Sequence, residues 1–121
     1  CGRIMTEIEK DGCFVDWKLR DPRFELISNW AHKRNLVEGS DPYRQLTKLL
    51  EEVGELASGV AKGNRDKVVD SIGDAVVVLT ILAEQHDVNI EDCIDAAWNE
   101  IKDRKGKMVN GIFVKESDLN G

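Results

Sequence analysis

Residues 41–62 read DPYRQLTKLLEEVGELASGVAK, and they carry the strongest structural signal in the chain. Apolar side chains recur there every three or four positions, which is the spacing of one face of an α-helix. This stripe consists of Leu46, Leu49, Leu50, Val53, Leu56, Ala57 and Val60. Asp41 is a favourable helix cap and Pro42 fits a first turn, so the sequence predicts an amphipathic helix that runs from Pro42 to about Lys62.

Similar signals outline three further helices and a hairpin. Asp and Pro at positions 21 and 22 open a helix to about Leu36, and Asn64, after Gly63, caps a helix over 65–86. Asn89 precedes a helix over 90–105, and the Asn-Gly pair within residues 108–114 is typical of a tight β-hairpin. Short connections between the last three helices favour antiparallel neighbours, so we expect an all-α, four-helix bundle-like domain over residues 21–121, with a short C-terminal hairpin.

Residues 1–20 show no clear period, and we interpret them as an N-terminal arm. Within it, residues 1–4 precede a candidate initiator, Met5, and are a candidate cloning remnant. The length of 121 residues fits one domain. No apolar run reaches the ~18 residues of a membrane span, and no apolar signal segment is evident. We therefore expect a cytoplasmic protein without a membrane partner.

The net charge and the cysteine content narrow the possible kinds of partner and metal site further. The net charge of -6 argues against a nucleic-acid polymer as partner, although a small anionic substrate stays compatible with it. Cys1, Cys13 and Cys93 are odd in number and lack the spacing of metal ligands. Cys93 falls on the apolar side of its helix, where we expect a reduced core thiol.

Two acidic clusters lie on neighbouring predicted helices. Glu51, Glu52 and Glu55 form the first cluster, and Asp70 and Asp74 form the second. Carboxylates three or four residues apart share a helix face, so two such faces can surround a hard divalent cation with oxygen. Glu52 is expected at the edge of the apolar stripe, whereas Glu51 points toward solvent or a supporting contact. Taken alone, the first cluster is more typical of a solvated acidic face.

The helix over 65–86 is apolar on two sides. One face carries Val68, Val69, Ile72, Val76 and Leu79, and the opposite face carries Asp70, Asp74, Val77 and Ile81. A helix that is apolar on both sides is packed on both sides, so we expect the two aspartates near buried side chains. A buried carboxylate needs a metal or a polar partner, for which an arginine or a backbone group is the alternative. A second copy of the chain is the simplest cover for Val77 and Ile81, which predicts a homodimer or homotetramer.

Basic and aromatic residues suggest a second part of the site. Asn99 and Lys102 lie three apart on one helix, and further cations follow them at its end. Such a basic end supplies donors for phosphate oxygens, although lysines there also complement the helix dipole. Trp30 and Trp98 can stack on a nucleobase or fill the core. The histidines are isolated and form no Glu-x-x-His motif, which argues against a di-iron site.

Residues 49–57, LLEEVGELA, and residues 70–79, DSIGDAVVVL, resemble the paired motifs of the MazG-like all-α nucleotide pyrophosphohydrolases. The similarity covers roughly residues 24–115, including the Lys-Gly-Lys-Met tail of short, phage-type members. This resemblance implies hydrolysis of nucleoside triphosphates between the α- and β-phosphates, with Mg²⁺, or alternatively Mn²⁺, as the metal. The products would be a nucleoside monophosphate and pyrophosphate.

The family pattern, EExxE followed by ExxD, binds metal through four carboxylates. By resemblance, Glu52, Glu55 and Asp74 are metal-binding and catalytic residues, whereas Ser71 stands where the fourth carboxylate is expected. Asp70, four residues before Asp74, is a candidate replacement; a site with fewer direct ligands and more water is the alternative. The resemblance also implies supporting and substrate-binding residues, namely Glu51 for support and Asn99, Lys102, Lys105 and Trp30 for substrate.

The leading hypothesis is therefore a house-cleaning or pool-adjusting hydrolase of (deoxy)nucleoside triphosphates. Alternatives within the superfamily are a dUTP/dUDP pyrophosphatase and a phosphoribosyl-ATP pyrophosphohydrolase. The latter is disfavoured because residues 75–79 are all apolar and supply no histidine after Asp74. From another class, a non-catalytic helical module could use the acidic face to hold a metal or a basic partner.

Overall fold

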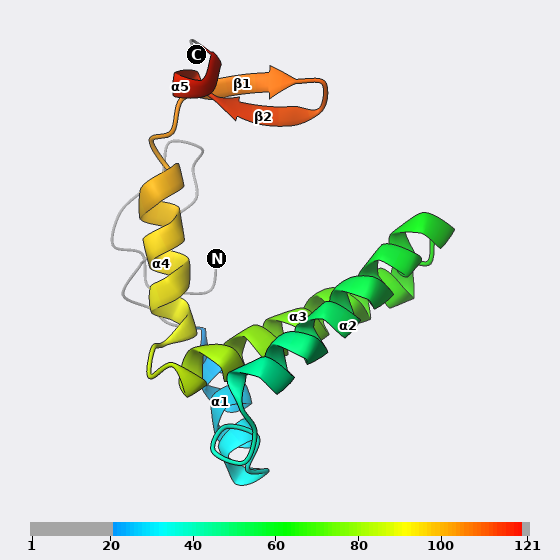
Figure 1. Ribbon diagram of the computed structural model, residues 1–121, viewed down its shortest axis with the longest axis vertical. Helices are drawn as coiled ribbons and strands as arrows, with labels where there is room; N and C mark the ends of the chain where they lie inside the picture. Colours follow the sequence, from blue (N-terminus) through cyan, green and yellow to red (C-terminus); the bar gives the residue numbers. More distant parts are fainter. Residues whose placement is uncertain (1–20, 120–121) are drawn as a thin grey trace.

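Four long helices and a small hairpin make up residues 21–119, which a computed structural model describes (Figure 1). The arm predicted over residues 1–20 lies outside the described residues. The elements are α1 Pro22–Lys33, α2 Pro42–Lys62, α3 Arg65–Gln85, α4 Ile90–Ile101, β1 Gly106–Val109, β2 Ile112–Lys115 and α5 Glu116–Leu119. The chain is thus mostly helical, as predicted.

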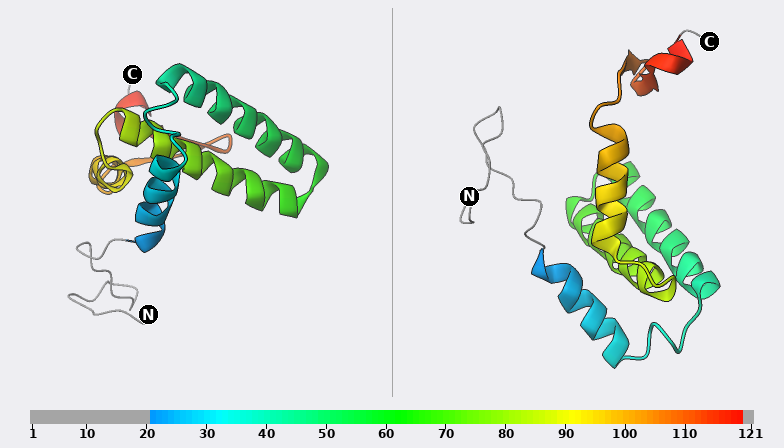
Figure 2. Two further views of the ribbon diagram at one scale, coloured as in Figure 1. Left: turned by 90° about the horizontal axis from the view of Figure 1, so that it is seen from below. Right: turned by 90° about the vertical axis from the view of Figure 1, so that its left-hand side faces the viewer.

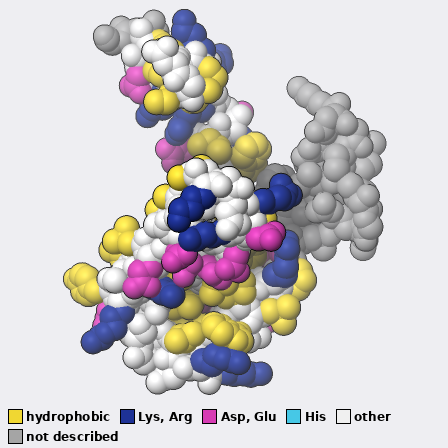
Figure 3. Space-filling view, turned by 90° about the vertical axis from the view of Figure 1, so that its right-hand side faces the viewer, with side chains coloured by type: hydrophobic (Ala, Val, Ile, Leu, Met, Phe, Trp, Pro, Cys, Tyr) yellow, Lys and Arg dark blue, Asp and Glu magenta, His cyan; other side chains and the backbone are white. Residues whose placement is uncertain are grey.

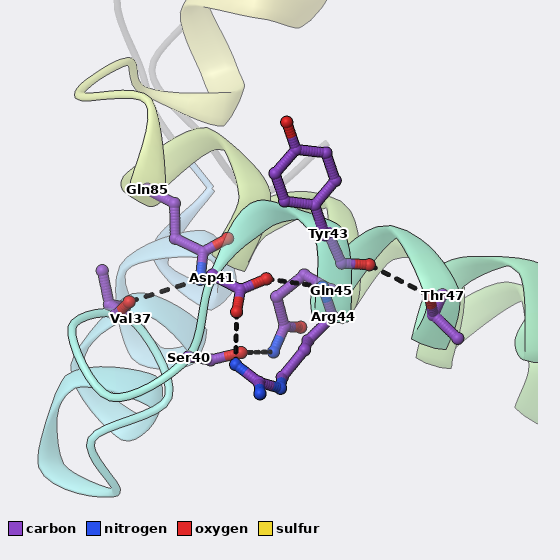
Figure 4. Close-up of polar contacts among 8 residues, drawn as sticks. All are labelled: Val37, Ser40, Asp41, Tyr43, Arg44, Gln45, Thr47 and Gln85. Atoms are coloured by element: carbon purple, nitrogen blue, oxygen red, sulfur yellow. Dashed lines mark hydrogen bonds and ion pairs between the residues drawn. The ribbon is translucent and has the colours of Figure 1, made fainter.

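The predicted helix caps are confirmed. Oδ1 of Asp41 accepts a hydrogen bond from the backbone N–H of Arg44 at 2.8 Å, and the Arg44 guanidinium also pairs with this carboxylate (Figure 4). Asn64 caps α3 and Asn89 caps α4 in the same way, through their side-chain oxygens. Gly63 ends α2 in the left-handed conformation, with a φ of 64°, which a residue without Cβ adopts readily.

The first helix is shorter than predicted. It ends at Lys33, whereas the sequence predicts an end near Leu36. Asn35 takes a left-handed φ of 58°, and the N–H of Leu36 donates to the carbonyl of Ala31 at 2.9 Å. Such a bond closes a helix by satisfying one of its last carbonyls. The following loop is tied to the end of α3, where Nε2 of Gln85 donates to the carbonyl of Val37 at 3.3 Å (Figure 4).

The fourth helix also ends early, at Ile101 rather than at Lys105. The carbonyl of Lys105 accepts a hydrogen bond from the N–H of Glu116 at 2.8 Å, so the chain has already entered the hairpin there. The predicted hairpin itself is confirmed. Strand β1 pairs antiparallel with β2, and Asn110 and Gly111 take the positive φ angles, 51° and 82°, that a tight turn requires.

Helices α2 and α3 form a closely packed antiparallel pair, which is the main body of the structure (Figure 2). The backbones approach closely at Gly59, where an added Cβ atom would lie 3.2 Å from Cγ2 of Val68. Helix α1 packs against the C-terminal part of α3. There, Ala31, Val37 and Ile81 form the buried core, with Val77 packed against it.

Two expectations about the faces of α3 are wrong. Val77 and Ile81 are covered by α1 and the loop after it, so they need no second copy of the chain. Conversely, the face expected to be core is only partly covered: Val68 and Val76 are half-buried, whereas Val69, Ile72 and Leu79 are 60%, 50% and 41% exposed. Both faces are apolar, and the packing of α1 and α2 together decides which residues of α3 are buried.

The chain does not close a four-helix bundle by itself. Helix α4 contacts α3 near the turn that joins them and then rises away from the α2–α3 pair (Figures 1 and 2). The apolar side of α4 consequently stays open, with Ile94, Trp98 and Ile101 each more than 40% exposed. Cys93 is a free, exposed thiol rather than a core residue, for the same reason.

Candidate active site

Glu52 is the one carboxylate of the first acidic cluster that the fold buries. Its residue exposure is 8%, whereas Glu51 and Glu55 are exposed. The ammonium group of Lys48 lies 3.4 Å from Oε1 of Glu52 and 3.5 Å from Oε2 of Glu51. The hydrogen bond to Glu52, together with the charge of Glu51, raises the pKa of Lys48 above its ordinary value. Glu52 is thus a carboxylate held near the helix interface by a cationic partner.

Glu55 has a cationic partner of its own on the other helix. Nζ of Lys67 lies 3.3 Å from Oε2 of Glu55, and it also donates to the hydroxyl of Ser58 at 3.4 Å. These contacts cross from α3 to α2 near the turn. Lys48 and Lys67 therefore place two ammonium groups against the carboxylates of α2.

The close approach at Gly59 sets which residues of the two helices lie at the same level. Glu52 precedes Gly59 by seven residues and Asp74 follows Val68 by six, so both lie about 10 Å along the pair from this contact. By the same argument, Ser71 lies level with Glu55. Ser71 is buried, at 3% exposure, so the position at which the family pattern has a carboxylate faces the interior of the pair.

Asp70, in contrast, is exposed, and the expectation that it lies among buried side chains is wrong. Helix α1 packs about two to three turns further along α3, near Val77 and Ile81, and leaves Asp70 uncovered. Asp74 is half-buried at the edge of the α1 contact. The two aspartates of the second cluster therefore have different environments.

The predicted ligands do not converge within one chain. Across residues 21–119, no three side chains of His, Cys, Asp or Glu come close enough together to hold a metal ion. The chemistry of the donors nevertheless fits Mg²⁺, which prefers carboxylate oxygens and retains several waters. Glu52 and Asp74 lie at a similar level along the helix pair.

A pocket of about 400 Å³ between α1 and α3 connects Asp74 with the predicted base-binding residue Trp30. Its other lining residues are Leu26, Ile27 and Val77, so its wall is largely apolar apart from one carboxylate. The guanidinium carbon of Arg34 lies 4.6 Å from the centroid of the Trp30 ring, in a cation–π contact. The aromatic ring, a cation and a carboxylate thus lie together at one end of α1.

The predicted phosphate-binding residues lie elsewhere in the chain. Asn99 and Lys102 line a separate pocket of about 220 Å³ on α4, together with Asp95 and Trp98. Lys105 follows α4 and is exposed. Because α4 rises away from the α2–α3 pair, a single chain does not bring these donors to Glu52 and Asp74.

The sequence profile of the MazG nucleotide pyrophosphohydrolase domain matches residues 41–109, which are more than half of the chain. The chain belongs to this family. The MazG match begins at the cap of α2 and ends with β1, so it contains both acidic clusters and the phosphate-binding candidates of α4. It leaves out α1, and with it Trp30, Arg34 and one wall of the pocket beside Asp74.

An uncharacterized 18.2 kDa protein from the rep-hol intergenic region of Haemophilus phage HP1 is 56% identical to this MazG-family chain over 63 residues. The matched residues are 52% of this chain and 39% of the phage protein. No solved structure matches the chain. Within the described part of the MazG-family chain, no helix is both long and apolar enough to span a membrane.

Three residues near the MazG acidic clusters were missed by the sequence reasoning, namely Lys48, Lys67 and Arg34. A spacing of four residues links Lys48 to Glu52 and Arg34 to Trp30, and side chains at that spacing meet on a helix. Both contacts could therefore have been predicted from the sequence. Lys67 contacts Glu55 across the helix pair, and its role required the packing of α2 on α3.

Proposed function

We propose that the chain is a Mg²⁺-dependent nucleoside triphosphate pyrophosphohydrolase with a house-cleaning or pool-adjusting role. The observation that carries this proposal is the buried carboxylate of Glu52, which lies level with Asp74 in the α2–α3 pair of a MazG-family domain. In the reaction, water attacks the α-phosphorus, the bond from that phosphorus to the bridging oxygen breaks, and a nucleoside monophosphate and pyrophosphate leave.

Glu52, Glu55 and Asp74 would hold the metal, with Asp70 as the candidate for a fourth ligand. Bound Mg²⁺ supplies charge neutralisation of the triphosphate, polarisation at phosphorus and a lowered pKa for a coordinated water. Either Glu52 or Glu55 orients or deprotonates the attacking water. Glu51 supports the group through their shared contact with Lys48.

The substrate would lie between the Trp30 pocket and the basic end of α4. Arg34 covers one face of the Trp30 ring, so a base stacks on the other face or displaces the guanidinium. Asn99, Lys102 and Lys105 donate to phosphate oxygens. Because α4 rises away from its own α2–α3 pair, these donors come from a second copy of the chain.

The uncovered apolar surface supports this assembly. Across residues 21–119, five hydrophobic residues are buried, whereas α2 alone leaves four large ones 48–64% exposed, namely Leu46, Leu50, Val53 and Val60. A monomer rarely leaves a contiguous apolar surface of this kind open to water. We therefore propose a homodimer as the smallest active unit, with a homotetramer as the alternative.

The test is pyrophosphate release from a panel of nucleoside and deoxynucleoside triphosphates, including dUTP and dUDP, with and without Mg²⁺. Glu52→Gln and Asp74→Asn remove charge from the central carboxylates, so we expect both to abolish turnover while the helical circular dichroism stays unchanged. The matched control is Asp66→Asn, which removes an exposed carboxylate from the first turn of α3 and should leave turnover near that of the unmodified chain.

Unchanged turnover in both Glu52→Gln and Asp74→Asn would refute the site assignment. Asp70→Asn tests the fourth ligand separately, because full activity and full Mg²⁺ affinity in that variant would exclude Asp70. Turnover confined to dUTP and dUDP would select the alternative pyrophosphatase. Mg²⁺ binding without pyrophosphate from any nucleotide would instead favour a non-catalytic helical module.

A further inference from the structure

The C-terminal hairpin presents apolar side chains that its own chain leaves largely open. Met108 and Phe113 pair across the strands, share one face, and are 63% and 46% exposed, while Ile112 on the opposite face is 68% exposed. The hairpin packs against α5, but it sits at the far end of α4, away from the α2–α3 pair (Figure 1). An isolated two-stranded hairpin is at best marginally stable in water, so this one gains from a further partner.

Charge divides sharply between the hairpin region and the helical body. Residues 102–119, which include α5, contain five Lys and Arg residues and three acidic residues, Asp103, Glu116 and Asp118, which gives a net charge of +2. Residues 21–101 contain sixteen acidic residues and eight Lys and Arg residues, which gives a net charge of -8. The basic end of the chain is therefore complementary to a helical body like its own.

The α2–α3 pair offers a surface of matching composition. Exposed apolar side chains, including Leu50, Val53 and Ile72, lie on the same two helices as the exposed carboxylates of Glu51 and Asp70. Figure 3, viewed from the side of the α2–α3 turn, shows apolar side chains on both sides of a row of Asp and Glu. The hairpin and α5, at the top of the same view, show apolar side chains bordered by Lys and Arg and, at one side, by acidic residues.

The geometry points to a second copy of this chain as the occupant of the hairpin surface. We propose that the hairpin of one copy docks on the α2–α3 face of another, through the hairpin face that carries Met108, Phe113 and Lys115. Helix α4, about 18 Å long, holds the hairpin away from its own α2–α3 pair, and a twofold arrangement lets each copy give and receive one hairpin. The docking rests on the proposed function and deepens it, because it carries Lys102 and Lys105 of one copy toward the carboxylates of the other.

Zero-length carbodiimide cross-linking of a mixture of ¹⁴N- and ¹⁵N-labelled chains, equilibrated so that copies exchange, tests the docking directly. We expect cross-links between Lys115 and carboxylates of α2 or α3, and mass spectrometry should show that the two peptides differ in isotope in about half of the products. Single-isotope products alone, which signify docking within one chain or on its own N-terminal residues, would overturn the proposal. The absence of such cross-links in a sample of dimeric mass would overturn it equally.

Self-association measured by analytical ultracentrifugation provides a second test. Met108→Glu should weaken the association at least tenfold, while Val88→Glu, which alters an exposed apolar residue at the turn between α3 and α4, should change it less than twofold. Lys115→Glu leaves the apolar strand residues intact and should weaken association more at low salt than at high salt. An unchanged dissociation constant in both hairpin variants, or a monomer at all concentrations, would refute the docking.

Neither experiment measures turnover, so the two proposals fail separately. Mixed-isotope cross-links in a protein that releases no pyrophosphate would support the docking and refute the hydrolase assignment. Pyrophosphate release without these cross-links would retain the hydrolase and refute the docking.

Discussion

At the scale of single residues, the candidate site depends on how the negative charge of its buried carboxylate is compensated. Glu52 is buried, and Lys48, itself about half exposed, lies within ion-pair distance of it from the preceding turn. A carboxylate without such a partner would bear an uncompensated desolvation cost. A divalent cation bound at Glu52 and Asp74 would take over part of this role, so the lysine and the metal are alternative sources of positive charge.

Lys48→Met tests this relation. We expect the variant to lower the free energy of unfolding in EDTA by about 0.5–1 kcal/mol, because the carboxylate of Glu52 loses a cationic partner that is itself partly screened by solvent. Saturating Mg²⁺ should recover more stability in the variant than in the unmodified chain, as followed by urea unfolding. Lys62→Met, which removes an exposed lysine from the last turn of the same helix, is the control and should show neither effect. An equal response of Lys48→Met and Lys62→Met to Mg²⁺ would contradict the shared role.

At the scale of helices and turns, the ends of elements follow from a few neighbouring residues. Gly63 has a φ of 64° and ends α2, whereas Gly54 lies inside the same helix with no atom within 4 Å of an added Cβ. The same substitution therefore meets opposite conditions at the two positions. In the left-handed conformation a side chain is strained, while inside a helix alanine is preferred to glycine.

Gly63→Ala should lower the free energy of unfolding by about 1 kcal/mol, and Gly54→Ala should raise it by roughly 0.5–1 kcal/mol. Thermal and urea unfolding of both variants, at one protein concentration, provide the measurement. Because the two variants differ only in position, each is the control for the other. A shift of the same sign in both would show that contacts beyond the single chain, rather than local conformation, dominate at one of these glycines.

Features that depend on neighbouring residues could be predicted from the sequence, whereas features that depend on the packing of distant helices could not. The caps at Asp41, Asn64 and Asn89 depend on residues within three positions, so they were predictable. The burial of Ile81 and the exposure of Ile72 were not, because both faces of α3 are apolar and only the packing of α1 and α2 separates them. Glu52 was expected at the edge of the apolar stripe of α2, but Gln45, Glu52 and Gly59 are the buried residues of this helix, and stripe residues such as Leu50 are exposed. That Glu52 lies at a level similar to that of Asp74 follows only from the close contact at Gly59.

At the scale of the whole molecule, α1 is joined to the rest by polar contacts as well as by a small core. Nε2 of His32 lies 3.2 Å from Oε2 of Glu84, and its Nδ1 lies 3.3 Å from Oε1 of Glu38. The hydroxyl of Ser28 donates to the other oxygen of Glu84 at 2.8 Å. These contacts link α1, the following loop and α3. They therefore hold the wall of the pocket that carries Trp30 in place beside Asp74.

The hydrogen bond to Glu84, with the charges of Glu38 and Glu84, raises the pKa of His32 above its ordinary value. A group whose pKa is raised by folding stabilises the fold fully below its unfolded pKa of about 6.5, and this contribution disappears as the pH rises through the folded pKa. His32→Gln should therefore lower the free energy of unfolding more at pH 5.5 than at pH 8.5, as measured by urea unfolding.

His86→Gln is the control for this prediction, because the His86 ring contacts only a backbone carbonyl of its own helix among the hydrogen bonds found in residues 21–119. A penalty for His32→Gln that is equal at both pH values would show that the imidazole acts through packing rather than charge. If the penalty for His32→Gln is larger at pH 5.5, as expected, the variant should also weaken nucleotide binding, because α1 packs less firmly on α3. Trp30 then no longer stays beside Asp74, and the pocket that joins them loses one of its walls.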